Sequence, residues 1–198
     1  MCETNSFKGW LIQVAVLSII LVLALWLSLR TRTPNFSIQN LTIDPLPTTN
    51  ITNTTTTAAN TTITFDLEIE NPNKDYNIWY SGVDLIWYHG GDTLGGASST
   101  TVSKSFSQGK SETNNFSNLK VNVYGENCTR FIQELVTSET AKLEARLATE
   151  IKYRMGVLRS KRHGLNLKGS AEVGRDGKIK GKKKTMKLRK SSSKWRLH

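Results

Sequence analysis

Seven asparagines in this sequence stand in the pattern Asn-x-Ser/Thr, which is the acceptor motif for N-linked glycosylation. One such motif arises easily by chance. All seven, however, follow residue 34 and fall within 93 residues, although a Thr-rich run raises their number. Their density predicts that this part of the chain lies outside the cytosol; a polar cytosolic loop is the alternative. The candidate acceptors are Asn35, Asn40, Asn50, Asn53, Asn60, Asn115 and Asn127.

Basic residues form the second group that could do chemistry. Residues 152–198 carry 17 Lys and Arg against two carboxylates, a net charge of +15, whereas residues 1–151 have a net charge of −4. Outside the cytosol, such a segment attracts acidic wall polysaccharide or anionic lipid heads. Inside, it would resemble a nuclear address or contact nucleic acid, and a solubilising tail is the plain alternative. The candidates are Lys178, Lys180, Lys182, Lys183, Lys184, Lys187, Arg189 and Lys190.

Patterns typical of enzymes are missing from the sequence. His89, His163 and His198 are too far apart to suggest a metal-binding motif. His89-Gly90-Gly91 faintly resembles an oxyanion-hole loop, but no Gly-x-Ser-x-Gly motif accompanies it. The carboxylates at residues 66, 68 and 70 alternate on a strand, which is typical of a solvated face. We therefore expect a non-enzymatic protein with no catalytic residues, no metal and no cofactor.

An uncharged stretch of twenty residues, Trp10 to Leu29, precedes all the candidate sites described so far. As a helix it would be about 30 Å long, the thickness of a bilayer's hydrocarbon core. We expect a single transmembrane helix over residues 10–29, after a short head at residues 1–9. A cleavable signal peptide is the alternative. The apolar run is longer than the usual ~7–15 residues, however, and no small-x-small cleavage site follows it.

The charges that flank this helix give only a weak signal about its orientation. Arg30 and Arg32 outnumber Lys8, which leans toward a cytosolic C-terminal side. We give the seven acceptor motifs more weight, and expect a cytosolic head with the C-terminal portion outside. Partners in nucleic acid are then not expected.

Two cysteines lie on opposite sides of the predicted helix, so no intrachain disulfide is expected. Cys2 is a candidate for S-acylation at the cytosolic face, and an unmodified thiol is an equal alternative. Cys128 is expected either to be buried or to pair between chains.

Alternating apolar and polar residues predict antiparallel strands after the helix. The pattern is clearest over 62–70, and it recurs over 36–43, 77–91, 117–125 and 165–173, with a last strand around Met186 and Leu188. The Thr- and Asn-rich run at 48–62 holds too little apolar surface to order itself, and is expected to be a surface loop.

Composition and pattern disagree over residues 141–156. Their Ala, Leu, Glu, Lys and Arg content favours a helix, but their apolar residues alternate, with only Thr149 breaking the face. Because periodicity outweighs composition, we predict a strand. One short amphipathic helix is predicted over 129–138, capped by Thr129. The expected fold is mainly β: an antiparallel two-sheet sandwich over 30–190 with one short helix, and a basic tail over 178–198.

Several of these motifs, in this order, resemble a plant family. They are LWLSLR at 25–30, FSIQN at 36–40, NPNKD at 71–75, IWY at 78–80, LGGAS at 94–98, FSQGK at 106–110, SKRHG at 160–164 and AEVGRDG at 171–177. The chain is similar to the non-race-specific disease resistance and harpin-induced-like family, whose external domain is the late embryogenesis abundant group 2 domain. The most specific motif is NPNK, which directly follows an alternating strand and precedes an aromatic pair.

The resemblance implies a plasma-membrane protein with an Ig-like or fibronectin-like β-sandwich outside the cell. It also implies a role in defence signalling, response to bacteria or wall–membrane contact, with protein partners in immune signalling. Protection against abiotic stress, or contact with lipid, is the alternative role.

The chain departs from that family in two places. Some members end in a hydrophobic tail that signals a GPI anchor, whereas this sequence ends in KWRLH, so we expect no such anchor. Some members carry Asn-Gly-Asp in the late turn, where this chain has Gly174, Arg175 and Asp176. These three residues are a candidate adhesive turn, and a plain β-turn is the alternative.

Overall fold

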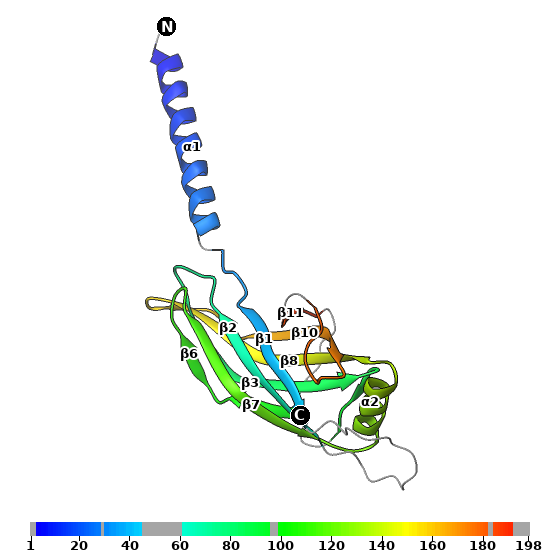
Figure 1. The fold of residues 1–198 in the computed structure, drawn as a ribbon. Helices are drawn as coiled ribbons and strands as arrows, with labels where there is room; N and C mark the ends of the chain where they lie inside the picture. Colours follow the sequence, from blue (N-terminus) through cyan, green and yellow to red (C-terminus); the bar gives the residue numbers. More distant parts are fainter. Residues whose placement is uncertain (1–2, 29, 45–60, 96–98, 182–183, 192–198) are drawn as a thin grey trace, which may run out of the picture. The chain divides into compact units, whose positions relative to one another are not determined.

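The computed structural model describes the whole chain except residues 1–2, 29, 45–60, 96–98, 182–183 and 192–198. It divides into two compact units, residues 1–32 and residues 33–198 (Figure 1). The predicted loop at 48–62 lies almost wholly outside the described residues, and strand β2 begins at its end.

The first unit is dominated by helix α1, Glu3–Ser28. Its stretch Phe7–Ala24 has a mean hydropathy of 2.1, and none of this stretch is buried within the protein. The Ser18 hydroxyl donates a hydrogen bond to the Val14 carbonyl at 2.9 Å, so this polar group has a partner within the helix. The helix is long and apolar enough to cross a bilayer, which makes it a candidate membrane anchor. A signal sequence near the N-terminus has the same properties.

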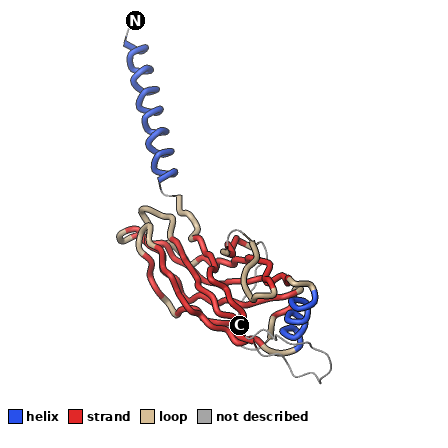
Figure 2. Tube along the Cα trace, in the orientation of Figure 1, coloured by secondary structure: helices blue, strands red, loops and turns tan. Residues whose placement is uncertain are grey.

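The second unit is mainly β, as predicted, and its described strands form one antiparallel sheet (Figure 2). The main path through this sheet runs β4-β3-β8-β10-β11-β1-β2-β7, with β5 and β6 paired to β3, and β9 paired to β8. The strands are β1 (Asn35–Asp44), β2 (Thr61–Glu70), β3 (Asn77–His89), β4 (Asp92–Thr93), β5 (Ser99–Ser103), β6 (Phe106–Gln108), β7 (Thr113–Val123), β8 (Thr140–Met155), β9 (Leu158–Arg159), β10 (His163–Gly174) and β11 (Thr185–Lys190).

Strand β11 joins two halves that the sequence analysis treated as separate sheets. It pairs with β10 through Arg189 and Lys168, and with β1 through Leu188 and Phe36. The two-layer arrangement is thus one continuous sheet that curls over its own core. This join depends on both edges of a six-residue strand, and the alternation of apolar residues does not reveal it.

Aromatic side chains hold the two halves face to face. Phe65 of β2 packs edge-on against Trp87 of β3, with ring centroids 5.3 Å apart, and both side chains are fully buried. Phe36 of β1 contacts Tyr80 of β3 in the same geometry at 6.3 Å. Edge-to-face pairs of this kind add to the free energy gained by burying their apolar area. The core therefore lies between β1–β2–β7 and β3–β8–β10.

The strand predicted over 141–156 is confirmed as β8. Leu143, Ala145 and Leu147 point inward and are fully buried or nearly so. Thr149 occupies the position that breaks the apolar face, and its hydroxyl donates to the carbonyl of Gly82. Gly82 lies where the pairing of β3 with β8 shifts register between Tyr80 and Val83. The polar residue thus contributes a hydrogen bond to the backbone at the bulge.

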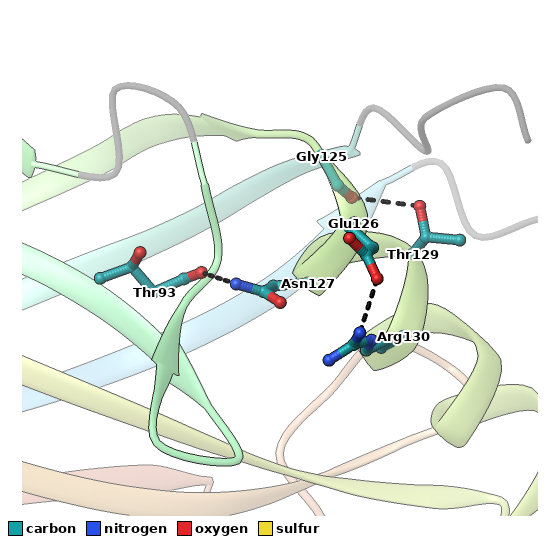
Figure 3. A network of polar contacts seen from close by, with 6 residues as sticks. All are labelled: Thr93, Gly125, Glu126, Asn127, Thr129 and Arg130. Atoms are coloured by element: carbon teal, nitrogen blue, oxygen red, sulfur yellow. Dashed lines mark hydrogen bonds and ion pairs between the residues drawn. The ribbon is translucent and has the colours of Figure 1, made fainter.

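Helix α2, Glu126–Thr137, begins three residues earlier than predicted. The prediction that Thr129 caps it is wrong. Thr129 lies inside the first turn, and its hydroxyl donates to the Gly125 carbonyl at 3.1 Å (Figure 3). Gly125 is the residue that precedes the helix, with a φ of 101°. The apolar face of α2 packs on the sheet through Cys128, Phe131, Ile132 and Leu135.

Two buried amides, Asn71 and Gln108, close one end of the curled sheet; we call this pair the amide clamp. The Asn71 Nδ2 donates to the carbonyls of Tyr76 at 2.8 Å and Gly109 at 2.7 Å. Its Oδ1 accepts from the backbone N–H and the Nδ2 of Asn73, at 3.0 and 2.9 Å. One side chain therefore fixes the β2–β3 turn and ties it to the β6–β7 turn.

Gln108 supplies the other half of the amide clamp. Its Nε2 donates to the carbonyls of Ile69 at 2.7 Å and Glu112 at 2.9 Å. Its Oε1 accepts from the Tyr80 hydroxyl at 2.8 Å, and burial raises the pKa of Tyr80 so that the phenol stays protonated. All the polar atoms of both clamp amides point at partners, which is what burial without loss of stability requires.

Candidate polyanion-binding surface

The basic residues singled out in the sequence separate into two groups in the structure. Met186 and Leu188 of β11 are buried, so Lys187 and Arg189 alternate with them and face outward. The other described candidates are exposed, in the connection before β11 or at its end: Lys178, Lys180, Lys184 and Lys190. Lys182 and Lys183 lie outside the described residues.

A row of cations crosses three neighbouring strands at the outward face. Arg189 of β11 pairs with Lys168 of β10, and Lys168 pairs in turn with Arg146 of β8. Residues paired directly across antiparallel strands on one face have Cβ atoms about 4.5–5.5 Å apart. We call Arg146, Lys168 and Arg189 the cationic row. The sequence analysis missed Arg146 and Lys168, although both stand at outward positions of predicted strands.

Only one end of the cationic row is neutralised within the protein. Arg146 is held by Glu144, with Nε and Oε1 2.7 Å apart, and its guanidinium lies 3.8 Å from the centre of the Tyr88 ring. Lys168 and Arg189 are exposed, and neither forms an ion pair with any other residue that the structure describes. Like charges directly opposite each other destabilise a sheet. An anion that bridges the row would relieve that repulsion.

The opposite half of the sheet presents acidic and amide groups. The carboxylates of Asp66, Glu68 and Glu70 on β2 accept hydrogen bonds from β1. Asn35 donates to Glu70 at 3.0 Å, and Asn40 donates to Asp66 at 2.7 Å. Glu68 accepts from Ser37 and Gln39, both at 3.1 Å.

Three predicted glycosylation acceptors lie exposed on this acidic half: Asn35 and Asn40 of β1, and Asn115 of β7. Asn115 pairs across the ladder with Glu68, and Asn35 pairs with Glu70, so both flank β2. Asn127 differs because it is half-buried at the start of α2. Its Nδ2 donates to the Thr93 carbonyl at 3.0 Å (Figure 3). Asn50, Asn53 and Asn60 lie outside the described residues.

The candidate adhesive turn is closed by its own hydrogen bonds. The Gly177 N–H donates to the Gly174 carbonyl at 2.9 Å, and Asp176 Oδ1 accepts from the Lys178 N–H at 3.2 Å. The backbone N–H of Arg175 donates to the backbone carbonyl of Glu139 at 3.1 Å, and the Arg175 side chain is exposed. This geometry is that of a plain β-turn, and adhesion through it stays a prediction.

Cys128 was expected either to be buried or to pair between chains, and in the structure it is buried. The thiol is fully buried on α2, and burial raises its pKa to about 11, so it is protonated and inaccessible at neutral pH. A buried thiol of this kind cannot pair with a second chain while the domain is folded. Cys2 lies outside the described residues.

His89 connects three elements of the domain. Its Nδ1 lies 2.9 Å from the Lys142 carbonyl, and its Nε2 lies 3.0 Å from a carboxylate oxygen of Glu134. Its ring also packs on Phe131 at 5.1 Å, so this side chain ties β3 to β8 and α2. Within the described ranges, no three His, Cys, Asp or Glu side chains gather as a metal site.

Comparison with known proteins gives one informative match. The chain is similar to Protein NDR1 of Arabidopsis thaliana, with 29% identity over 181 residues that cover 88% of this chain and 78% of that protein. This similarity supports assignment to the non-race-specific disease resistance and harpin-induced-like family. No protein-family model matches the sequence. A solved protein from Archaeoglobus fulgidus aligns over 66% of this chain and 94% of its own chain, at 12% identity. Its TM-score is 0.29, too low to indicate a shared fold.

The motifs that carry the family resemblance form buried contacts and turns of the domain. NPNKD and FSQGK contribute Asn71 and Gln108 to the amide clamp, and AEVGRDG forms the end of β10 and the closed turn that follows. The cationic row includes no residue of those motifs. The motifs of the resemblance therefore lie in the structural frame of the domain, and the candidate binding surface has to be tested on its own residues.

Proposed function

We propose that this protein is a non-enzymatic, plasma-membrane-anchored surface protein in the defence response of a plant. Its short head is cytosolic, α1 crosses the membrane, and the β domain lies outside as a glycosylated late embryogenesis abundant group 2 type domain. Its family supports the role in defence. The single observation that supports contact with the wall is the cationic row. Two exposed cations in register, with no counter-ion among the described residues, favour a repeating polyanion. The proposed ligand is acidic wall polysaccharide.

The proposed orientation predicts N-linked glycans on the β domain. Treatment of the protein from plant membranes with an N-glycosidase should increase its electrophoretic mobility. Removing the exposed acceptors, by Asn35→Gln, Asn40→Gln and Asn115→Gln together, should remove part of that shift. In sealed microsomes, the β domain should also resist added protease, whereas the head should not. An unchanged mobility together with a protease-sensitive β domain would reverse the proposed orientation.

The cationic row predicts salt-sensitive binding to demethylated pectin. The full chain in nanodiscs should bind more weakly by about tenfold or more when Lys168→Gln and Arg189→Gln are combined. A hydrogen bond to a charged group contributes ~1.5–3 kcal/mol, and 1.4 kcal/mol is tenfold in Kd. Raising the ionic strength from about 0.05 to 0.5 M should weaken the wild-type chain similarly, because salt screens exposed charges.

The matched control for this experiment carries Lys104→Gln and Lys120→Gln, which remove two exposed charges away from the cationic row. It should bind pectin within about twofold of the wild-type chain, since only long-range attraction changes. If both double variants lose the same affinity, net charge drives the binding and the cationic row is not a site. Binding that is insensitive to salt would contradict the proposal directly.

A further inference from the structure

The hairpin between β8 and β9 exposes apolar side chains at its tip. Met155 pairs with Leu158, and Gly156 turns the chain with a φ of 57°. Val157 is 95% exposed and Leu158 is 64% exposed. In the second unit, the only other large apolar residue that the structure describes as exposed is Tyr124. A turn of this kind needs glycine but does not need valine and leucine, so the fold does not account for these two residues.

Cations surround this tip. Arg154 and Arg159 form the pair next to it, and Lys161 and Arg162 follow along the chain. Arg162 is partly engaged, because its Nη1 lies 3.6 Å from Glu150. Arg159 and Lys161 form no ion pair with the residues that the structure describes. Two exposed apolar side chains next to several basic ones suit the boundary of a phospholipid layer, where hydrocarbon lies beneath negatively charged phosphates.

The hairpin holds its shape through its own hydrogen bonds. Ser160 donates its N–H to the Tyr153 carbonyl at 2.9 Å, and its Oγ accepts from the Tyr153 N–H at 3.0 Å. Arg154 Nε donates to the Gly156 carbonyl at 3.1 Å, which holds this side chain beside the turn. Insertion of Val157 and Leu158 would therefore cost little ordering of the chain.

Sheet register places this hairpin at the end of the domain where the chain enters from α1. Arg154 pairs with Asn77 at the start of β3, directly after the turn that follows β2. Glu70, the last residue of β2 before that turn, pairs with Asn35, the first residue of β1. Figure 1 shows β8 running on into a hairpin (yellow) at this end of the sheet. Six residues, 29–34, join α1 to β1, and six residues span at most about 20 Å.

We propose that Val157 and Leu158 insert into the headgroup region of the bilayer that α1 spans, with Arg159 and Lys161 at its phosphates. This inference rests on the proposed membrane anchoring, and adds a second contact with the same membrane. It commits to a phospholipid surface as the occupant, and zwitterionic lipids suffice because their phosphates carry negative charge. Docking of the hairpin on another protein is the outcome that the test distinguishes.

The test measures the depth of the tip in the full chain, reconstituted in nanodiscs of phosphatidylcholine. A nitroxide is attached at Leu158→Cys in a Cys2→Ser background, where the buried Cys128 stays unlabelled. The label should collide several-fold more with oxygen, which concentrates in lipid, than with an aqueous nickel chelate. A label at Asp92→Cys, exposed in the hairpin at the other end of β3, should show the reverse.

Arg159→Gln with Lys161→Gln should move the Leu158 label into water, whereas Lys104→Gln with Lys120→Gln should not. Because these side chains are exposed, thermal unfolding midpoints should be unchanged, which excludes misfolding as the cause. A Leu158 label as aqueous as the Asp92 label would overturn membrane insertion and leave protein docking. Failure of the anchoring itself is separate, because alkaline carbonate would then extract the chain from plant membranes.

Discussion

Replacing Asn71 by alanine is expected to lower the free energy of unfolding of the β domain by about 3 kcal/mol. The substitution removes four hydrogen bonds inside a site with no exposure. It removes the Asn71 donor from the partly buried carbonyls of Tyr76 and Gly109, and losing a partner costs a buried polar group roughly 1–3 kcal/mol. The lower end of the summed range applies because the turn can relax. Urea unfolding of the full chain in detergent, followed by tryptophan fluorescence, measures the change.

The control for this prediction is Asn122→Ala on β7. Asn122 is exposed and accepts one hydrogen bond from the Thr62 hydroxyl at 2.9 Å, so its loss should cost less than about 1 kcal/mol. Gln108→Leu tests the other half of the amide clamp. Its effect should be less than additive with that of Asn71→Ala, because both side chains hold the same turn, residues 108–112. Fully additive effects would show two independent sites and no shared clamp.

Gly95→Ala is expected to destabilise the domain by about 3 kcal/mol or more, and Gly90→Ala by only about 1 kcal/mol. Both glycines have a left-handed backbone, with φ values of 71° and 60°, and a side chain there costs roughly 1–2 kcal/mol. A Cβ at Gly95 would in addition overlap the backbone carbonyl of Tyr124, whereas a Cβ at Gly90 would meet nothing within 4 Å. The difference between the two variants therefore isolates the steric overlap.

The position of Gly95 explains why this overlap cannot be relieved cheaply. Leu94, its neighbour, is fully buried, and its N–H donates to the Trp87 carbonyl at 3.1 Å. Tyr124 directly precedes Gly125, the N-cap residue of α2. Thermal unfolding of both variants, with near-UV circular dichroism as the readout, measures the difference. Equal midpoints for the two variants would show that the backbone conformation alone sets the cost.

These two predictions place the residues that carry the family resemblance in the structural frame of the domain. Asn71 and Gln108 belong to NPNKD and FSQGK, and Gly95 belongs to LGGAS. Each is required by a buried hydrogen bond or by a close backbone approach. Sequence reasoning used these motifs for recognition, but it could not assign them a physical role, because their partners come from distant segments.

The sequence by itself determined the long elements. A run of twenty uncharged residues predicted a helix of membrane length. Period-2 alternation predicted which side chains of β2, β8 and β10 face the core, even where the composition of β8 favoured a helix. Both signals are local, because a side chain's face within a strand depends only on its neighbours along the chain.

Only the tertiary structure decided what those faces meet. Strand β11 joins the two halves of the sheet, the cationic row forms where β8, β10 and β11 pair in register, and the amide clamp links two turns. The exposed tip at Val157 and Leu158 likewise became visible only when β9 folded back on β8. Register is set by packing between segments far apart in sequence, and alternation along a single strand carries no information about the strand that will lie beside it.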